Sequence, residues 1–197
     1  MIHNGIDIHT FVKCGCDNLK SRFNLEDKTV VLGVAAQWSV RKGLHDFIRL
    51  RELMPRSKYT FVLIGLSDAQ IAELPDGIIG IKRTEDVHEL VQWYSAADVF
   101  VNPTYQDNYP TVNLEAIACG TPVITYRTGG SPEAITPETG FVVTQGNIQD
   151  IIVAIKQIES RGKDAYGRIC RDRAEKYFDK TICFQKYLDV YNRLLNN

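Results

Sequence analysis

The chain has 197 residues, of which 44% are hydrophobic and 24% are charged, and its formal net charge is −1 at pH 7. This composition is typical of a soluble globular protein with one large domain or two small ones. With no basic tail, acidic block or apolar run of roughly 20 residues, we expect no nucleic-acid partner, no anionic membrane surface and no transmembrane helix.

Five cysteines bear on the compartment and on metal binding; they stand at positions 14, 16, 119, 170 and 183. Their odd number and spacing indicate no disulfide framework, and the first residues lack a signal-peptide pattern. We therefore expect a reducing, cytoplasmic environment. Cys14 and Cys16, with His3 and His9 upstream, suggest a zinc set, but this spacing matches no common zinc module. Free thiols are the favoured interpretation, and we expect no metal.

Apolar runs and helical periodicities alternate along the chain. Strands are expected where β-branched or aromatic runs end in small residues, Gly or Asn-Pro, at 30–36, 59–65, 77–81, 97–103, 122–126 and 140–143. Helices are expected between Arg41 and Pro55 and at 68–74, 85–96, 110–119, 147–160, 163–178 and 181–195. Inward positions of the helix at 85–96 are Val87, Leu90, Val91 and Tyr94. This order predicts a doubly wound α/β fold, a parallel sheet of about six strands with a helical carboxyl-terminal end.

In such a sheet the ligand lies at the carboxyl ends of the strands, near the switch point of the topology. Arg41 and Lys42 follow the first strand and precede a helix, where they can meet phosphates. The glycine-rich turn 128–130 follows the fifth strand and lets the backbone approach a ligand. Each signal alone is weak, because paired basic residues are usually solvated and most glycine turns are only turns. Their meeting at one sheet edge favours a binding site.

The start of the helix at 110–119 is a further signal of a binding site. Pro110 suits the first turn of a helix, and Asp107 or Asn108 suits the cap before it. The free backbone amides of residues 111–113 then favour an anion, most often phosphate.

Glu115 is the one acid within this otherwise apolar helix. A helix that is apolar on all sides is buried, and an unpaired buried carboxylate costs several kcal/mol or shifts its pKa upward. Glu115 therefore needs a partner. Physical chemistry alone leaves two partners equally open, a structural Arg or Lys and a pair of ligand hydroxyls.

Five motifs resemble the carboxyl-terminal, donor-binding half of the GT-B glycosyltransferases of the large retaining family four, and they follow in the same order. The likeness covers essentially the whole chain. The segments that carry it are IHNGIDIHTF (2–11), RKGLHDFI (41–48), AADVFVNPT (96–104), DNYPTVNLEAIACGTPVI (107–124) and GGSPEAITPETGFVV (129–143). The fourth segment is similar to the E-x7-E motif of that family.

The resemblance implies a role for each matching residue. Glu115 would hold the ribose hydroxyls of a sugar nucleotide, Asp107 would face the donor sugar, and Lys42 would neutralise the diphosphate and stabilise its departure. The catalytic set is thus Asp107, Lys42 and Glu115, and the donor-binding set is Gln37, Arg41, Lys42, Ile81, Lys82, Asn108, Tyr109, Thr111, Val112 and Glu115. The base would lie against Ile81 and Lys82. No cofactor is implied, and the substrate is a nucleoside-diphosphate sugar, with UDP ranked ahead of GDP and ADP.

Two positions depart from the family pattern. Gln37 stands where the family usually has Arg, and Asp107 stands where it usually has Glu. The first change removes a charge, so stabilisation of the leaving group would be weaker or would come from another residue such as Arg41. The second change shortens an acid by one methylene.

The resemblance also implies a domain organisation. Residues 1–16 would be a linker from an absent amino-terminal domain, 17–180 the donor-binding domain, and 181–197 a helix that crosses back to the absent domain. Tyr187, Val190, Tyr191 and Leu194 share one face of that helix, which would be buried in the other domain or in a dimer.

The expected activity is transfer of a sugar, with retention, to a saccharide or lipid-linked acceptor, by an enzyme of which this chain is an inactive half. The missing domain would bring the acceptor and any peripheral contact with the inner face of a membrane. Two alternatives stay open: a stand-alone, non-catalytic nucleotide-binding module, and a sugar-nucleotide epimerase, against which the linker and the E-x7-E pattern argue.

Overall fold

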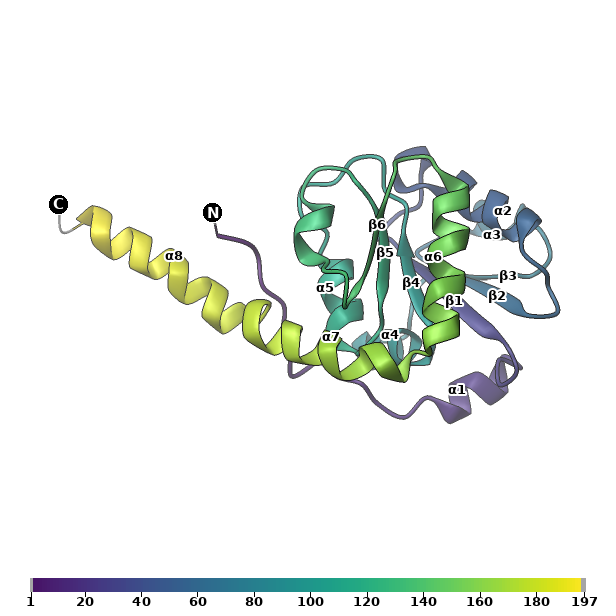
Figure 1. Cartoon of the computed structure of the whole chain (residues 1–197), viewed down its shortest axis with the longest axis horizontal. Coiled ribbons are helices and arrows are strands. Elements are labelled where there is room, and N and C mark those ends of the chain that lie inside the picture. Colours follow the sequence, from purple (N-terminus) through teal and green to yellow (C-terminus); the bar gives the residue numbers. More distant parts are fainter. Residues whose placement is uncertain (1, 196–197) are drawn as a thin grey trace.

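A six-stranded parallel sheet with helices on both faces forms the body of the computed structural model, which describes residues 2–195 (Figure 1). The strands lie in the order β3-β2-β1-β4-β5-β6, so the chain builds outward from β1 and then, from β4, in the opposite direction. Their bounds are β1 Thr29–Val34, β2 Tyr59–Ile64, β3 Ile78–Ile81, β4 Val99–Asn102, β5 Val123–Tyr126 and β6 Gly140–Val143. The predicted doubly wound fold is confirmed.

The helices form two layers. On one face α2 (Leu44–Leu53) packs beside α6 (Ile148–Arg161). On the other, α5 (Thr111–Ala118) packs between α4 (Val87–Ala96) and α7 (Asp164–Tyr177). The remaining helical elements are α1 (Asp17–Arg22), α3 (Asp68–Ala72), α8 (Lys180–Leu195) and the short 3₁₀ turns η1 (Val40–Lys42) and η2 (Ser131–Ala134).

The expected strands and long helices are confirmed, with ends that differ by one or two residues. Helix α1 was not expected, because six residues that bury only Leu19 show no helical period. One expected inward position was wrong: Val87 is 49% exposed. It is the first residue of α4, directly after the cap Asp86, and the helix turns its buried face to the sheet only from Val91 onward. Trp93, which the pattern missed, is fully buried there.

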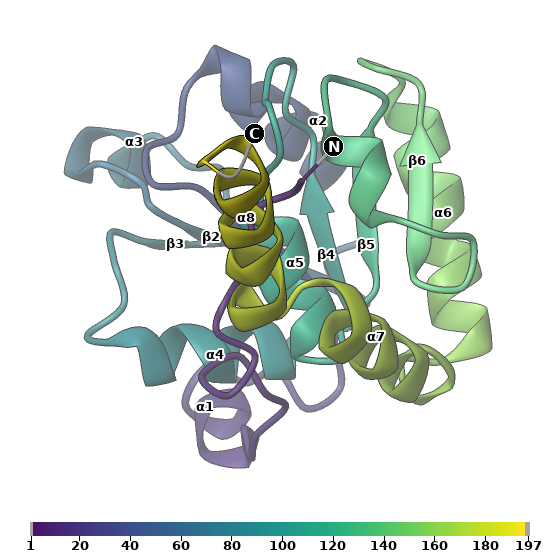
Figure 2. The same cartoon turned by 90° about the vertical axis from the view of Figure 1, so that its left-hand side faces the viewer.

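The amino-terminal segment runs beside the start of α8 (Figures 1 and 2). Ile6 pairs with Asp179 in a parallel bridge, and its backbone bonds Phe178 and Lys180 at 2.8 and 2.9 Å. The ammonium of Lys180 also contacts the Asp7 carboxylate at 2.7 Å. These contacts fix the beginning of α8 on the body, although the two segments are far apart in sequence.

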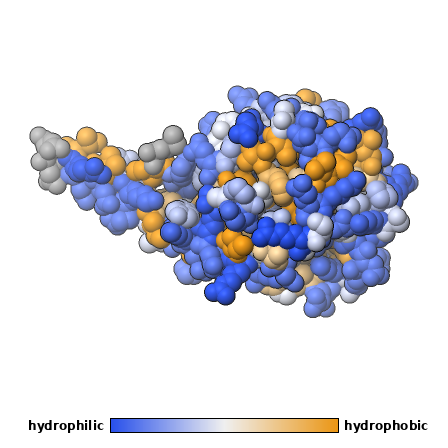
Figure 3. Space-filling view, in the orientation of Figure 1, coloured by the Kyte–Doolittle hydropathy of each residue, from blue (hydrophilic) through white to orange (hydrophobic). Residues whose placement is uncertain are grey.

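Helix α8 then projects away from the body (Figure 1). Apolar residues alternate with charged ones along its surface in Figure 3. Of the face predicted from its spacing, Tyr187 is partly covered and donates to the Ile2 carbonyl at 3.3 Å, whereas Tyr191 and Leu194 are exposed. None of the helices within residues 2–195 has the length and apolar character that crossing a bilayer requires.

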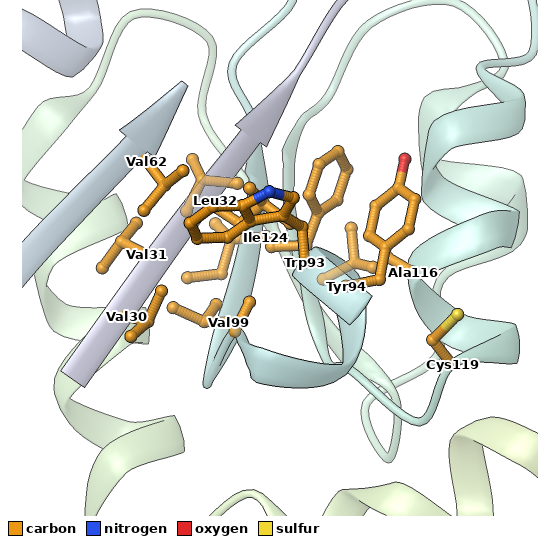
Figure 4. Close-up of a cluster of buried hydrophobic side chains, with 14 of the residues drawn as sticks. Val30, Val31, Leu32, Val62, Trp93, Tyr94, Val99, Ala116, Cys119 and Ile124 are labelled. Atoms are coloured by element: carbon orange, nitrogen blue, oxygen red, sulfur yellow. The ribbon is translucent and has the colours of Figure 1, made fainter. Parts of the chain in front are cut away.

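The core lies on both sides of the central strands. Val30, Val31 and Leu32 of β1 are fully buried, because a helix layer covers each face of the sheet. Figure 4 shows Trp93 and Tyr94 of α4 packed against these strands, with Tyr94 next to Ala116 of α5. Burying one such side chain contributes about 1.5–3 kcal/mol, so this packing holds α4 and α5 in fixed positions on the sheet.

Candidate functional site

A cavity of about 600 Å³ opens at the carboxyl edge of the sheet, toward which the β4 and β6 arrowheads point in Figure 2. It lies between β1 and β4, which are neighbours in the sheet. The helices that follow these strands, α2 and α5, lie on opposite faces, so their loops diverge and leave a crevice. The predicted site residues in its lining are Gln37, Arg41, Lys42, Asp107, Tyr109, Thr111 and Val112.

Lys42 and Asp107 meet in an ion pair beside the cavity. The Lys42 Nζ atom lies 2.6 Å from Asp107 Oδ2, and the two side chains are 25% and 18% exposed. Lys42 comes from η1 after β1, and Asp107 comes from the loop after β4. In this ion pair the two charges neutralise each other. Arg41 is then the cation in the lining that no carboxylate pairs with, among the residues that the structure describes.

Gly43 brings the Lys42 loop close to the loop after β4. Its φ of 79° lies in the left-handed region, and a Cβ atom there would meet the Pro103 carbonyl oxygen at 2.3 Å. The backbone N–H of Tyr105 adds a hydrogen bond of 2.8 Å to the carbonyl of Arg41. Only glycine fits this contact, which explains the lysine-glycine sequence locally.

The first turn of α5 presents free donors to the cavity. Within residues 2–195 the backbone N–H groups of Thr111 and Val112 have no hydrogen-bond partner, whereas that of Asn113 bonds the Pro110 carbonyl at 3.2 Å. The expectation that Asp107 or Asn108 caps this helix was wrong, since Pro110 holds the cap position and no side chain bonds these amides. The Asp107 carboxylate pairs with Lys42 instead, because an ammonium is the stronger partner. The free amides suit an anion.

Glu115 lies one turn deeper in α5 and has a hydroxyl as its partner. Tyr94 donates to Glu115 Oε2 at 2.9 Å. Burial raises the pKa of Glu115, although its hydrogen bonds with Tyr94 and Thr111 oppose the shift. No Arg or Lys forms an ion pair with it in the described part of the chain, which removes one of the two partners left open by the sequence. Figure 4 shows the Tyr94 hydroxyl pointing along α5, away from Cys119.

The remaining predicted residues take different places. Tyr109 lines the cavity and stacks on the His3 ring, with centroids 4.5 Å apart. Asn108 is outside the lining, and its carbonyl accepts from Gly130 at 2.7 Å. Ile81 and Lys82 also lie outside it, at the end of the edge strand β3, where Lys82 pairs with an aspartate at 2.6 Å. Glu115 is close to the lining residue Thr111 but is not part of the open wall.

The glycine pair after β5 packs against protein. A Cβ atom on Gly129, whose φ is 46°, would meet the Asp107 carbonyl oxygen at 1.8 Å, and one on Gly130 would meet the Asn108 carbonyl oxygen at 2.1 Å. The turn therefore supports the loop that carries Asp107, rather than offering its own backbone to the cavity.

The set of site residues predicted from the sequence leaves out two residues of this region. Asn102, at the end of β4, is buried, lines the cavity and donates to Asn113 Oδ1 at 2.8 Å. A polar residue that ends an apolar strand was its available signal. Tyr94 was expected in the core, but nothing in the sequence links it to Glu115, which lies 21 residues away on another helix.

No metal-binding cluster of three or more His, Cys, Asp or Glu side chains occurs among the described residues. Cys14 and Cys16 are partly buried free thiols, and the Cys14 sulfur lies 3.7 Å from the Ser95 hydroxyl.

Known proteins resemble the chain in sequence and in fold. Residues 28–160 match the family model described as "Glycosyl transferases group 1". The capsular polysaccharide biosynthesis glycosyltransferase CapM of Staphylococcus aureus is 25% identical over 207 residues, which cover 98% of this chain and 53% of CapM.

Two solved structures have the same fold. Sucrose-phosphate synthase from Thermosynechococcus elongatus superposes with a TM-score of 0.84 at 25% identity, covering 99% of this chain and 52% of that one. Anabaena HepE, solved in complex with UDP, superposes with a TM-score of 0.85 at 22% identity, covering 98% of this chain and 57% of HepE. The chain thus spans about half the length of each of these three proteins.

Proposed function

Because the chain belongs to the glycosyl transferases group 1 family, we propose that it forms the donor-binding half of a glycosyltransferase. Its substrate in this proposal is a nucleoside-diphosphate sugar, from which the complete enzyme moves the sugar to an acceptor with retention of configuration. In this proposal the acceptor site belongs to the missing half, since the chain covers 53% of CapM and 52% of the sucrose-phosphate synthase. A saccharide or lipid-linked acceptor agrees with the similarity to CapM, which acts in capsular polysaccharide biosynthesis.

The observation that carries the proposal is the set of cations and N–H donors around the cavity, all of which favour a bound anion. Arg41 and Lys42, which follow β1, line the cavity on one side. Thr111 and Val112 of α5, whose backbone amides have no partner among residues 2–195, line it as well. Fixed N–H groups at a helix terminus, together with a lysine, are the features that bind phosphate groups elsewhere. This arrangement fits a diphosphate without requiring a metal ion.

Lys42 has a second role in this proposal. A bound diphosphate would compete with Asp107 for the Lys42 ammonium, which lies 2.6 Å from the Asp107 carboxylate. The Asp107 carboxylate would then be free to accept hydrogen bonds from hydroxyls of the donor sugar. When the glycosidic bond to phosphate breaks, Lys42 and the α5 amides stabilise the negative charge that develops on the leaving diphosphate.

Glu115 would hold the ribose. Its carboxylate already accepts a hydroxyl from Tyr94, and burial raises its pKa. Ribose hydroxyls would add donors to the charged form and relieve part of that burial cost. UDP is our first choice of nucleotide, supported by the fold neighbour HepE, whose structures contain UDP and UDP-glucose.

Thermal unfolding with and without nucleotides tests this function. UDP, GDP, ADP and UDP-glucose are added to the wild-type chain, to Glu115→Ala and to Asp27→Ala, a control at an exposed acid just before β1 and so at the opposite edge of the sheet. A ligand at a hundred times its dissociation constant adds roughly 2.7 kcal/mol of stability, which raises the melting temperature measurably. We expect UDP to stabilise the wild type and Asp27→Ala but not Glu115→Ala.

Two results count against the proposal. If no nucleotide raises the melting temperature, this half does not form the donor site by itself. If UDP stabilises Glu115→Ala as much as wild type, a site exists, but Glu115 does not hold the ribose.

A further inference from the structure

We propose that Asp46, with the hydroxyls of Tyr105 and Tyr126, forms a positioning cluster that fixes the distance between Lys42 and Asp107. These three residues are called the Asp46 cluster below. The inference rests on the proposed function, because it assigns the cluster to diphosphate binding. None of the three lines the cavity, so they would act through other residues rather than touch the substrate.

Both oxygens of the Asp46 carboxylate are engaged by tyrosines. Tyr126 donates to Oδ2 at 2.7 Å, and Tyr105 donates to Oδ1 at 3.2 Å. The two rings contact edge to face, with centroids 5.5 Å apart. Tyr126 is fully buried at the end of β5, and Asp46 lies in the first turn of α2, where the helix dipole favours its negative charge.

Tyr105 connects the Asp46 cluster to the loops around the cavity. Its N–H donates to the carbonyl of Arg41 at 2.8 Å. Its own carbonyl accepts from Thr128 at 3.1 Å and from Gln145 at 2.9 Å. One residue thus joins the segments that follow β1, β4, β5 and β6. Arg41 immediately precedes Lys42, and Tyr105 stands two residues before Asp107, so these bonds hold both partners of the ion pair.

The chemistry of the Asp46 cluster favours positioning over general stabilisation. Among residues 2–195 no cation forms an ion pair with Asp46, so a carboxylate is held between two aromatic hydroxyls. Burial is the main cause that raises the pKa of Tyr105, and the bond to Asp46 adds to the shift, so the hydroxyl remains a donor at neutral pH. A well-packed apolar cluster would usually stabilise a fold as well as a partly buried charge does. What the polar bonds add is direction, since they fix where the Tyr105 backbone lies.

The inference predicts which part of a nucleotide is affected. If Tyr105 loses its bond to Asp46, the loop that carries Asp107 moves relative to Lys42. The phosphate beyond the first would then bind less tightly, whereas contacts to the base and ribose at Glu115 would stay as they are. UDP and UMP therefore serve as the probe pair.

The test measures dissociation constants of UDP and UMP by calorimetry for wild type and Tyr105→Phe, which keeps the ring and removes only the hydroxyl. We expect the UDP constant to rise about tenfold, as for one lost hydrogen bond to a charged group, and the UMP constant to stay within about twofold. Tyr59→Phe is the matched control, because the Tyr59 hydroxyl donates to a carboxylate, Glu159, at 2.8 Å and Tyr59 opens β2, at the other edge of the sheet. It should leave the ratio of the two constants unchanged.

A double-mutant cycle separates positioning from a merely structural role. In a Lys42→Ala background the effect of Tyr105→Phe on UDP should vanish, because the residue through which it acts is gone. The inference is overturned if Tyr105→Phe raises the dissociation constants of UDP and UMP by the same factor. It is also overturned if the variant raises that of UDP by the same factor with and without Lys42. Asp46→Asn, which keeps the shape and one accepting oxygen, replaces Tyr105→Phe if that variant does not fold.

Hydrogen exchange in the ligand-free chain keeps this inference distinct from the proposed function. If wild type binds no nucleotide, the proposed function fails, and the Asp46 cluster is still testable. Tyr105→Phe should speed exchange at the Tyr105 amide, which bonds the Arg41 carbonyl, while amides of β2 stay protected. Unchanged exchange at Tyr105 would overturn the idea that the Asp46 cluster holds this loop.

Discussion

At the scale of single residues, Glu115, to which we assign ribose binding, shows how a group proposed for binding can oppose stability. Burial raises its pKa above the usual value, which means that folding makes the charged form less favourable than it is in the unfolded chain. Tyr94, whose pKa is raised well above normal by burial and then by Glu115, donates a hydroxyl but brings no charge. A carboxylate retained at such a site is more consistent with binding than with packing.

Glu115→Gln should therefore stabilise the free chain at neutral pH and lower its affinity for UDP. The glutamine oxygen can still accept from Tyr94, and no charge is buried. A gain of about 1 kcal/mol would raise the melting temperature by about 2–4 °C in a chain of this size. Calorimetric melting of wild type and variant, together with UDP titration, measures both effects.

The pH dependence gives the sign of the same effect. Since the folded pKa of Glu115 lies above its unfolded value, wild type is most stable when the group is protonated and loses that stability as the pH rises through the folded pKa. Gln does not titrate. The gap in melting temperature between Glu115→Gln and wild type should thus be small near pH 4 and widen toward neutral pH. A gap that stays constant over this range would show that the charge is not the cause.

At the scale of elements, α8 differs from the other long helices because it leaves the body of the protein. Its exposed apolar side chains include Phe184 (56%), Leu188 (52%) and Tyr191 (58%), which lie three or four residues apart and so share a face. Exposed apolar surface of this kind is typical of contact sites. The face predicted from the sequence, with Tyr187, Val190, Tyr191 and Leu194, shares Tyr191 with this one, and that it meets another domain or a second copy stays a prediction.

Charged substitutions on α8 should lower self-association of the isolated chain without destabilising its body. Leu188→Glu adds a negative charge to the exposed apolar face. The control is Lys186→Gln, which lowers the net charge by the same amount at an exposed position two residues away, and so on another side of the helix. We expect sedimentation to give a smaller average mass for Leu188→Glu than for wild type at high concentration. Melting temperatures should agree closely among the three proteins. A wild-type chain that is monomeric at every concentration would contradict the prediction.

At the scale of the whole molecule, the reversal of strand order creates the site. β1 and β4 are neighbours although 64 residues lie between Val34, which ends β1, and Val99, which begins β4. The helices that follow them, α2 and α5, lie on opposite faces of the sheet. The cavity at this reversal gathers Lys42, Asp107 and the first turn of α5. The reactivity of the five cysteine thiols depends on how tightly the rest of the fold is packed.

Thiol labelling should divide the cysteines into two groups. Burial raises the pKa of Cys119 and of Cys170 to about 12, and it also raises that of Cys183. Because the thiolate is the reactive form, these three should react with iodoacetamide only after unfolding, whereas Cys14 and Cys16, which are partly exposed, should react in the native chain. Mass spectrometry of pulse-labelled protein, with and without denaturant, counts both groups. Native labelling of Cys170 as fast as Cys14 would show that α7 does not pack as described.

The sequence by itself determined the strands and long helices, the parallel doubly wound sheet and the edge at which the candidate site lies. Those properties depend on local periodicity and on glycine, proline and asparagine at the ends of elements, which act within a few residues. The motifs around Lys42, Asp107 and Glu115 could be found in the same way, since each is a continuous segment.

Only the tertiary structure decided which side chains meet. Asp107 pairs with Lys42 across 65 residues, Glu115 accepts from Tyr94 across 21, and Tyr105 reaches Asp46 across 59. The same cause made the expected helix cap at Asp107 wrong, because Lys42 attracts its carboxylate away from the α5 amides. Such contacts join loops that strand order brings together, and strand order follows from how the helix layers cover the whole sheet rather than from any local pattern.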